Sequence, residues 1–310
     1  MRNIDRIKEI GVYFDKNGMK STKNKYNLKE SSIQRNLRRY RNILNGTLSI
    51  DTRTPKIFLF DVETSPMECY TWGIYQQFLT YNNIIKPSAM LSWAGKWLFD
   101  DEIIGHRVNT SDATNRKDKN IVSKLYKYFD DADIIIAHNV KKFDYKVCNT
   151  RFILNGLTPP SPFKMIDTLI EIKKNFRFPC NKLGYISSIL GDQEKQNVSF
   201  DLWHRSVTGD DTGLQDMLMY NKQDVRALEE LYLRIRPWAK PGVNLGLYYD
   251  DMGDRCPNCG SKDIYSKGHY YTTVGRYRSI KCNQCGAVGR NKYQELTADD
   301  KRDLLRPVGI

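Results

Sequence analysis

The stretch Phe58-Leu59-Phe60-Asp61-Val62-Glu63-Thr64 decides the fold and the chemistry that we expect of this chain. Its apolar character predicts a β-strand, in which successive side chains point to opposite faces. Asp61 and Glu63 are two residues apart, so they would share one face. Two carboxylates this close repel each other, and Mg²⁺, which prefers oxygen ligands, would offset the repulsion. The alternative interpretation is a solvent-facing acidic pair on an edge strand.

Composition and charge predict a globular protein that binds a polyanion. The chain has 310 residues, of which 40% are hydrophobic and 12% aromatic, and its net charge is +13. Residues 1–55 contain 13 basic and 5 acidic residues, residues 250–310 contain 11 and 8, and the middle carries only +2. This distribution favours a nearly neutral catalytic body between basic nucleic-acid-binding modules. A generally solubilising surface is the alternative.

Two absences in the sequence suggest an intracellular chain. No apolar stretch approaches the roughly 20 residues of a membrane-spanning helix, and no apolar signal-peptide region follows Met1. We therefore expect a cytoplasmic protein with no membrane partner. Four of the seven cysteines form two Cys-x-x-Cys pairs, which in a reducing compartment favour a metal over disulfides.

The strongly basic N-terminal segment, residues 1–45, shows three short helical patterns separated by turn residues. They cover Ile4 to Phe14, Ser21 to Asn27 with Ser21 as N-cap, and Ser32 to Arg41 with Ile33 and Leu37 facing inward. The arrangement resembles a helix-turn-helix DNA-binding domain. Arg35, Arg38 and Arg39 on the third helix would contact nucleic acid. A small basic helical bundle without DNA function is the alternative, and residues 46–55 are interpreted as a linker.

The central region alternates strand and helix patterns, which indicates an α/β core. Leu91–Trp97 and Ile134–Ala137 are predicted strands, the second covered on both faces, and residues 121–129 are a predicted helix. Asp144 follows the second strand, where a loop turns into a helix that ends near Gly156. Ligands gather at such strand ends. The alternative is that Asp144 is only a first-turn acid favoured by the helix dipole.

A long helical pattern from Leu214 to Ile235 places Tyr220 and Asp224 on one helix face, because they are four residues apart. Such a pair is common by chance. The pair becomes informative through the order of three motifs along the chain. These are an Asp-x-Glu strand, an Asn139-to-Asp144 segment after a later strand, and a Tyr-x-x-x-Asp helix.

These three motifs, in this order, resemble the DEDD (DnaQ-like) 3′→5′ exonuclease superfamily. The resemblance covers roughly residues 56–238 and implies an RNase H-like mixed sheet flanked by helices, in a domain that we place at residues 56–249. It also implies two Mg²⁺ or Mn²⁺ ions held by Asp61, Glu63, Asp144 and Asp224, with Tyr220 orienting the attacking water. Met219 stands where the histidine subtype has its histidine, so the tyrosine subtype is indicated. The chain looks similar to the exonuclease domain of family B DNA polymerases and to phage and bacterial exonucleases, which implies a bacterial or phage-infected cell.

Several minor features fit this resemblance. Residues 182–190 look like the short helix between the second and third motifs, and Asp167 is interpreted as an N-cap. His138 is expected to be a hydrogen-bonded loop residue. The polar residues 192–212 are expected to form a mobile loop near the site.

The C-terminal region contains two Cys-x-x-Cys knuckles, each followed by a glycine that permits a tight turn. Cys256, Cys259, Cys282 and Cys285 are the four thiols. Their spacing resembles a zinc ribbon over residues 250–295, with one structural Zn²⁺ and a hairpin between the knuckles. Residues 296–310 would form a tail with a helix capped by Thr297. The ribbon's arginines and tyrosines are compatible with a nucleic-acid surface, although its role could be purely structural.

The sequence as a whole predicts a metal-dependent 3′→5′ exonuclease acting on nucleic acid, with DNA favoured over RNA. Replication or recombination proteins are possible partners. An RNase H-like endonuclease or a transposase-type enzyme is the first alternative. A non-catalytic DNA-binding regulator is the second, and it is disfavoured because none of the four acidic positions is missing.

Overall fold

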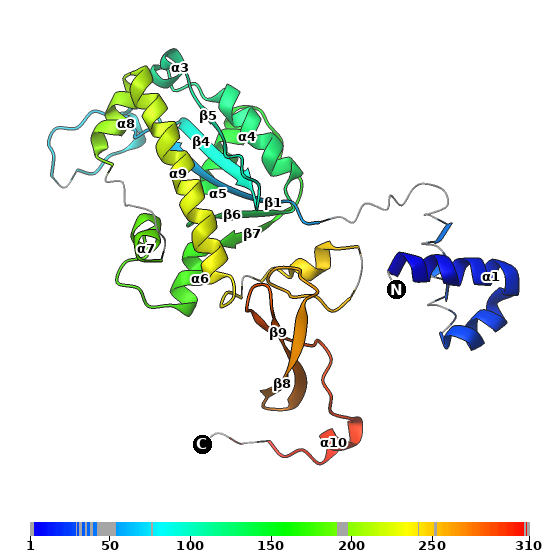
Figure 1. Ribbon diagram of the computed structural model, residues 1–310. Coiled ribbons are helices and arrows are strands. Elements are labelled where there is room, and N and C mark those ends of the chain that lie inside the picture. The colour runs from blue at the N-terminus through cyan, green and yellow to red at the C-terminus, as the bar shows by residue number, and fades with distance from the viewer. Residues whose placement is uncertain are drawn as a thin grey trace. The chain divides into compact units, whose positions relative to one another are not determined.

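The computed structural model describes most of the chain and divides it into two compact units (Figure 1). The described residues are 3–28, 30, 33–34, 36–37, 40–41, 54–75, 77–190, 198–240, 242–250, 253–306 and 308, with only the backbone for 3–7. One unit comprises residues 55–243 and 285–288. The other comprises residues 1–54, 244–284 and 289–310.

A five-stranded mixed sheet of order β5-β4-β1-β6-β7 forms the centre of the first unit. The central strand β1 is antiparallel to β4 and parallel to β6, β5 is antiparallel to β4, and β7 is parallel to β6. The strands are β1 (Ile57–Thr64), β4 (Met90–Trp97), β5 (Ile104–Arg107), β6 (Ile134–Ala137) and β7 (Lys164–Asp167). This is the predicted α/β architecture of an RNase H-like fold.

Helices flank the sheet, and α9 is the longest of them (Figure 1). They are α3 (Thr110–Thr114), α4 (Lys119–Asp131), α5 (Asp144–Leu154), α6 (Thr168–Asn175), α7 (Leu183–Leu190), α8 (Phe200–Val207) and α9 (Asp211–Ile235). The expected mobile loop over residues 192–212 is wrong in part: Phe200–Val207 is helical because Leu202 and Ser206 turn one face into the core. Residues 191–197 lie outside the described part.

Alternation along β1 gives the sheet two different faces. Phe58 and Phe60 are fully buried and contact the rings of Tyr128 and Phe129 on α4. Burying a side chain of this size stabilises the fold by roughly 1.5–3 kcal/mol. The acidic residues of β1 alternate with these aromatic residues, and α9 packs against β1, β4 and β5. The sheet therefore separates an aromatic core from an acidic face.

Between β1 and β4 the chain makes an excursion that contains a short hairpin. β2 (Glu68–Cys69) pairs with β3 (Ile84–Lys86), and the 3₁₀ helix η1 (Tyr81–Asn83) precedes β3. The hairpin agrees with the expectation of further strands in this aromatic-rich region.

In the N-terminal segment, α1 (Asn3–Tyr26) is broken at Gly18, where φ is 70°. The break after Asn17 is as predicted, whereas Ser21 is not an N-cap because the helix resumes before it. The described residues at positions 33–34, 36–37 and 40–41 are helical. Ile33 and Leu37 are buried as predicted, together with Tyr40. A helix-turn-helix remains a prediction for this segment.

The C-terminal region of the chain forms a three-stranded sheet of order β10-β9-β8. Its strands are β8 (Ile264–Thr272), β9 (Gly275–Cys282) and β10 (Val288–Arg290), preceded by the 3₁₀ helix η2 (Leu245–Tyr248) and followed by α10 (Ala298–Arg302). β8 and β9 form the expected hairpin. Thr297 caps α10 through a capping box, again as predicted.

Candidate active site

The acidic face of β1 lies beyond the point where its partner strand ends. β1 pairs with β6 only as far as Leu59 opposite Ile136, while Asp61 and Glu63 lie further toward the carboxyl end of β1. In α/β sheets this end of a strand is where ligands bind. Both acids sit on a central strand, so the interpretation as an edge-strand pair is wrong.

Helix α9 crosses this face and brings its own polar residues to the acids. Asn221 is fully buried, and its Nδ2 donates a hydrogen bond of 2.5 Å to Oδ2 of Asp61. One turn further, a carboxylate oxygen of Asp224 lies with one from Asp61 and one from Glu63, all within 4.8 Å of one another. Elements about 160 residues apart in sequence thus converge on one acidic cluster.

Asp144, the first residue of α5, is a close neighbour of this cluster but not a member of the 4.8 Å set. It is 2% exposed. Its carboxyl group accepts a hydrogen bond from the backbone N–H of Val62, and its charge raises the pKa of both Asp61 and Glu63. The structure therefore brings together three of the four predicted metal ligands and positions the fourth within electrostatic reach.

The pKa values of all four carboxyl groups are raised, chiefly because burial disfavours their charged forms. Burial and repulsion from its acidic neighbours raise the pKa of Asp61 well above its usual value. The pKa of Glu63 rises to about 8, that of Asp144 to about 7 and that of Asp224 to about 6. Carboxylates that crowd together in this way fit a divalent cation, which would favour their ionised forms.

Tyr220 and Trp203 complete the wall of the acidic cluster. The hydroxyl of Tyr220 hydrogen-bonds to Asp224, and burial together with the neighbouring acids raises the pKa of the phenol. Trp203 on α8 hydrogen-bonds to Glu63, and its ring meets the Tyr220 ring edge-on at 6.3 Å. Sequence reasoning missed Trp203 and Asn221. Asn221 could have been predicted as a site residue because it directly follows Tyr220. Trp203 could not, because residues 192–212 were interpreted as a loop.

Asp167 fixes the loop that leads from β6 to Asp144. As predicted, it is the N-cap of α6, where it accepts hydrogen bonds from the N–H groups of Leu169 and Ile170. It also accepts from the N–H groups of Asn139 and Lys141, at 3.1 and 3.2 Å. Asn139 has a φ of 71°. The loop that carries the second motif is thus held at its start.

His138 has the structural role expected of it. Its Nδ1 lies 3.0 Å from Oγ1 of Thr168, and its Nε2 lies 2.9 Å from the carbonyl oxygen of Asn181. Burial lowers its pKa. Its contacts connect β6 to the segment before α7.

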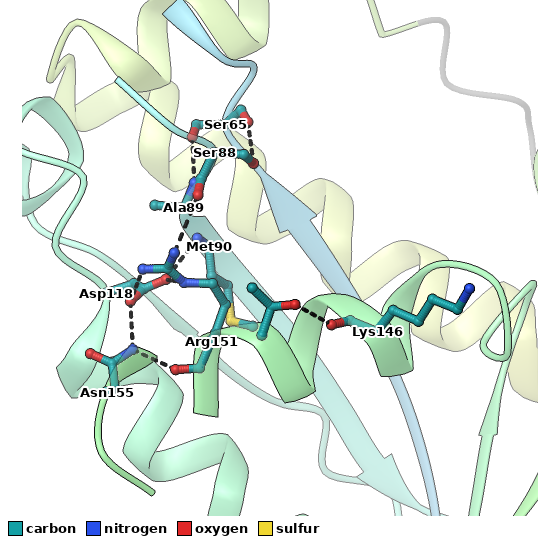
Figure 2. A network of polar contacts seen from close by, with 9 residues as sticks. Ser65, Ser88, Ala89, Met90, Asp118, Lys146, Arg151 and Asn155 are labelled. Carbon is teal, nitrogen blue, oxygen red and sulfur yellow. Dashed lines mark hydrogen bonds and ion pairs between the residues drawn. The ribbon is translucent and has the colours of Figure 1, made fainter. Parts of the chain in front are cut away.

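A buried polar network holds α5 against the sheet (Figure 2). Asp118 accepts from Nε and Nη2 of Arg151 at 2.5 and 2.8 Å, from Asn155 at 3.0 Å and from the N–H of Met90 at 2.9 Å. Arg151 also donates to the carbonyl oxygen of Ser88 at 3.3 Å. Since Asp144 lies seven residues before Arg151 on the same helix, this network fixes the helix that carries it.

Four thiols form a second candidate metal centre in the C-terminal region. The Sγ atoms of Cys256, Cys259, Cys282 and Cys285 lie within 4.8 Å of one another. Gly260 and Gly286 both have a φ of 77°, so each knuckle makes the tight turn expected of it. A closed set of four thiolates fits structural Zn²⁺. The predicted nucleic-acid-binding residues Arg35, Arg38 and Arg39 lie outside the described residues.

A comparison with protein-family models agrees with this fold. Residues 94–236 match the family model described as RNase_H superfamily, a range that includes Asp144, Tyr220 and Asp224 but begins after β1. Among solved structures, the chain is similar to the family B DNA polymerase from the hyperthermophilic archaeon Pyrobaculum calidifontis, at 15% identity and a TM-score of 0.43. The similarity covers 60% of this chain and 26% of that polymerase, about a quarter of its length. A search of curated proteins finds no match.

The chain therefore carries an RNase H-like domain, a fold of nucleases, with an acidic cluster suited to divalent metals. Among the described residues, no helix combines the length and apolar character needed to cross a bilayer.

Proposed function

We propose that this protein is a metal-dependent 3′→5′ exonuclease of the tyrosine-type DEDD class, which removes nucleotides from the ends of nucleic acid, preferably DNA. The observation that carries the proposal is the convergence of Asp61, Glu63 and Asp224 within 4.8 Å, with Tyr220 hydrogen-bonded to Asp224. This arrangement supports a Tyr-x-x-x-Asp helix that works together with the strand acids.

In this proposal Asp61, Glu63, Asp144 and Asp224 hold two Mg²⁺ or Mn²⁺ ions. When bound, such ions activate water and stabilise the leaving oxygen of an in-line displacement. Hydrolysis joins a water oxygen to the phosphorus of the last nucleotide and breaks its bond to the 3′ oxygen of the preceding one. The products are a nucleoside 5′-monophosphate and a new 3′ hydroxyl.

Tyr220 would orient the attacking water rather than deprotonate it. Its raised pKa keeps the phenol protonated at neutral pH, so its O–H donates to Asp224. The oxygen lone pairs of the phenol then remain available to accept a hydrogen bond from water. Asn221 would act indirectly, because its 2.5 Å hydrogen bond holds the carboxyl group of Asp61 in place.

A degradation assay tests the proposal directly. With Mg²⁺, a 5′-labelled single strand should shorten stepwise, a 3′-labelled strand should release labelled mononucleotide at once, and chelation should stop both. Asp224→Asn should reduce the rate by at least about a thousandfold because a metal ligand is lost, and Tyr220→Phe by about a hundredfold because the attacking water is no longer oriented. Nicking of a covalently closed circle would instead favour the endonuclease or transposase-type alternative.

Two modules would hold the substrate or brace the catalytic unit. We propose that Arg35, Arg38 and Arg39 in residues 1–45 contact phosphates, and that residues 250–295 form a ribbon around one Zn²⁺. The boundaries at residues 45, 55, 249 and 295 are part of this proposal, as is a role beside replication or recombination proteins. Replacing the three arginines with glutamine should weaken DNA binding and reduce its salt dependence. Unchanged affinity would remove this role.

A further inference from the structure

An exposed aromatic loop, described at residues 70–75 and 77–81, lies between β1 and β4. Trp72 is 101% exposed and Phe78 is 97% exposed. Tyr70, Ile74, Tyr75 and Tyr81 are each at least 75% exposed. Single exposed apolar side chains are ordinary, but this many within one short segment mark a binding surface.

The aromatic loop is carried by a short stalk, which is the hairpin of β2 and β3. Below its tip, β2 pairs with β3, and an ion pair of 3.2 Å joins Glu68 to Lys86. The N–H of Tyr70 donates to the carbonyl oxygen of Asn83 at 3.0 Å, and the side chain of Asn83 accepts from the N–H of Thr80 at 2.9 Å. These bonds close the stalk and leave the rings facing solvent.

The base of the excursion is fixed beside the candidate active site. Ser65 is two residues after Glu63, and its N–H donates to the carbonyl oxygen of Ala89 at 2.8 Å, while Oγ of Ser88 donates to the carbonyl oxygen of Ser65 at 2.7 Å. Figure 2 shows this clamp joined to the Asp118–Arg151 network. Both ends of the excursion are therefore tied to the helix that carries Asp144.

A pocket of about 390 Å³ lies between the start of the excursion and α8. It is lined by Thr64, Ser65 and Pro66 from the excursion and by Phe200 and Trp203 from α8. Trp203 is the residue that hydrogen-bonds to Glu63. An apolar, aromatic surface thus begins next to the acids and lies along the segment that leads to the loop.

The chemistry of the loop favours flat, apolar groups over phosphates. Residues 66–86 contain only one acid and one base, Glu68 and Lys86, and these two pair with each other. The loop therefore offers aromatic faces without net charge. Unpaired nucleobases stack on such faces irrespective of their sequence, while a duplex keeps its bases stacked internally.

We propose that the aromatic loop is a stacking platform for unpaired nucleobases, so that the protein acts on single-stranded ends. The proposal rests on the proposed function, because the excursion that carries this loop starts two residues after Glu63, beside the site that would hold the 3′ end of a strand. Bases a few nucleotides from the end would stack on Trp72 and its aromatic neighbours. The contribution to affinity would come from stacking and would not depend on salt.

Binding of a 5′-labelled 20-nucleotide oligothymidylate to the full-length protein tests this, measured by fluorescence anisotropy in buffer without Mg²⁺ or Mn²⁺. Trp72→Ala should weaken binding about tenfold, within the range for stacking of one base on one ring, and should leave the salt slope unchanged. Replacing the bases of nucleotides 3–8 from the 3′ end with abasic sites should weaken wild-type binding similarly and remove the difference between the two proteins. Leu154→Ala, which truncates an apolar residue 66% exposed at the far end of α5, is the matched control and should bind like wild type.

Equal affinity of wild type and Trp72→Ala for the oligonucleotide would overturn the proposal. So would self-association of the wild type that Trp72→Ala abolishes with DNA binding unchanged, because the loop would then be an interface between copies of this chain. In the presence of Mg²⁺, Trp72→Ala should raise KM for the 20-nucleotide strand and leave kcat and the hydrolysis of a trinucleotide unchanged. An equal loss of trinucleotide hydrolysis in Trp72→Ala would contradict the proposal, because the loop would then act at the reacting end and not on bases a few nucleotides away. If wild type bound as expected but shortened no strand, the exonuclease proposal would fail and the platform would stand.

Discussion

Folding buries four carboxyl groups close together, which disfavours their ionised forms and costs stability. They belong to Asp61, Glu63, Asp144 and Asp224. Burial raises the pKa of each, and the charges of neighbouring acids raise those of Asp61 and Glu63 further. Raised pKa values in such a cluster are typical of functional sites rather than of structural ion pairs. The cost to stability has a measurable dependence on pH.

Stability without divalent ions should fall as the pH rises from about 5 to 8. In the folded protein Glu63 and Asp144 keep their protons up to about pH 8 and 7, whereas in the unfolded chain they lose them near pH 4. The folded state binds more protons in this window, so the free energy of unfolding decreases with pH. Asp61→Asn removes a carboxyl group whose own pKa is raised and should flatten the decrease, as calorimetric Tm values would show. Parallel pH profiles for the two proteins would contradict this.

Asn221 should act on the metals without touching the substrate. Asn221→Ala removes the hydrogen bond to Asp61 and frees its carboxyl group to rotate. Loss of a supporting contact of this kind costs about 10- to 100-fold in metal affinity. The Mg²⁺ concentration for half-maximal rate should rise by that factor, while the rate at saturating Mg²⁺ should recover most of its wild-type value. A rate that saturating Mg²⁺ does not restore would assign Asn221 a direct part in the reaction.

At the scale of elements, the site depends on three pieces held in register: β1, the long helix α9 and the start of α5. Helix α9 approaches the sheet closely at β5, where a Cβ on Gly105 would lie 2.8 Å from Leu218 and 2.9 Å from Lys222. Helix α5 is held by the Asp118–Arg151 network. Small displacements of either helix would separate the acids.

The network on α5 should be strongly coupled. Arg151→Met leaves the fully buried Asp118 carboxylate without its cation and should destabilise the protein by about 3–5 kcal/mol. Adding Asp118→Asn should restore most of this loss, because the amide oxygen still accepts from the N–H of Met90. Denaturant titrations of the two single variants and the double variant measure the coupling. The exposed Lys56–Asp131 pair is the control, and Lys56→Ala should cost about 1 kcal/mol or less.

The elements that sequence could predict are those with a strong periodic pattern. β1, β6 and α9 follow from alternation, a short apolar run and a long helical repeat, and the clustering of Asp61 with Asp224 was expected from the family resemblance. α8 was missed because it was interpreted as part of the polar stretch 192–212, although four of its eight residues are apolar. Its helical state depends on burying Leu202 and Ser206. Trp203 was missed with it. Asp144 was predicted as a ligand equal to the other three acids, but it lies outside the set within 4.8 Å. Such distances depend on packing that no local sequence pattern encodes.

At the scale of the whole molecule, the chain combines a unit that contains the acidic cluster with a second unit, and four cysteines cluster in its C-terminal region. Most of the excess positive charge lies outside the central region. A charged flank attracts nucleic acid over a distance that depends on ionic strength. Affinity should therefore come largely from the flanks, and hydrolysis from the centre.

The cysteine cluster should hold one zinc ion per chain. Elemental analysis of the purified protein measures this, and Cys259→Ser should lower the zinc content because a structural site needs all four thiolates. The variant should unfold its C-terminal sheet at a lower temperature while still hydrolysing a short oligonucleotide. Cys148 is not part of the cluster, so Cys148→Ser is the control and should keep its zinc. Wild-type protein without zinc would contradict the ribbon.

Divalent-ion binding to the acidic cluster tests the central claim most directly. Mn²⁺ titrated into zinc-loaded protein at pH 8 and followed by electron paramagnetic resonance counts the bound ions. The account predicts two Mn²⁺ ions per wild-type chain, spin-coupled because they share the acidic cluster, and loss of at least one in Asp61→Asn. Failure of the wild type to bind Mn²⁺, or an unchanged signal in Asp61→Asn, would contradict it.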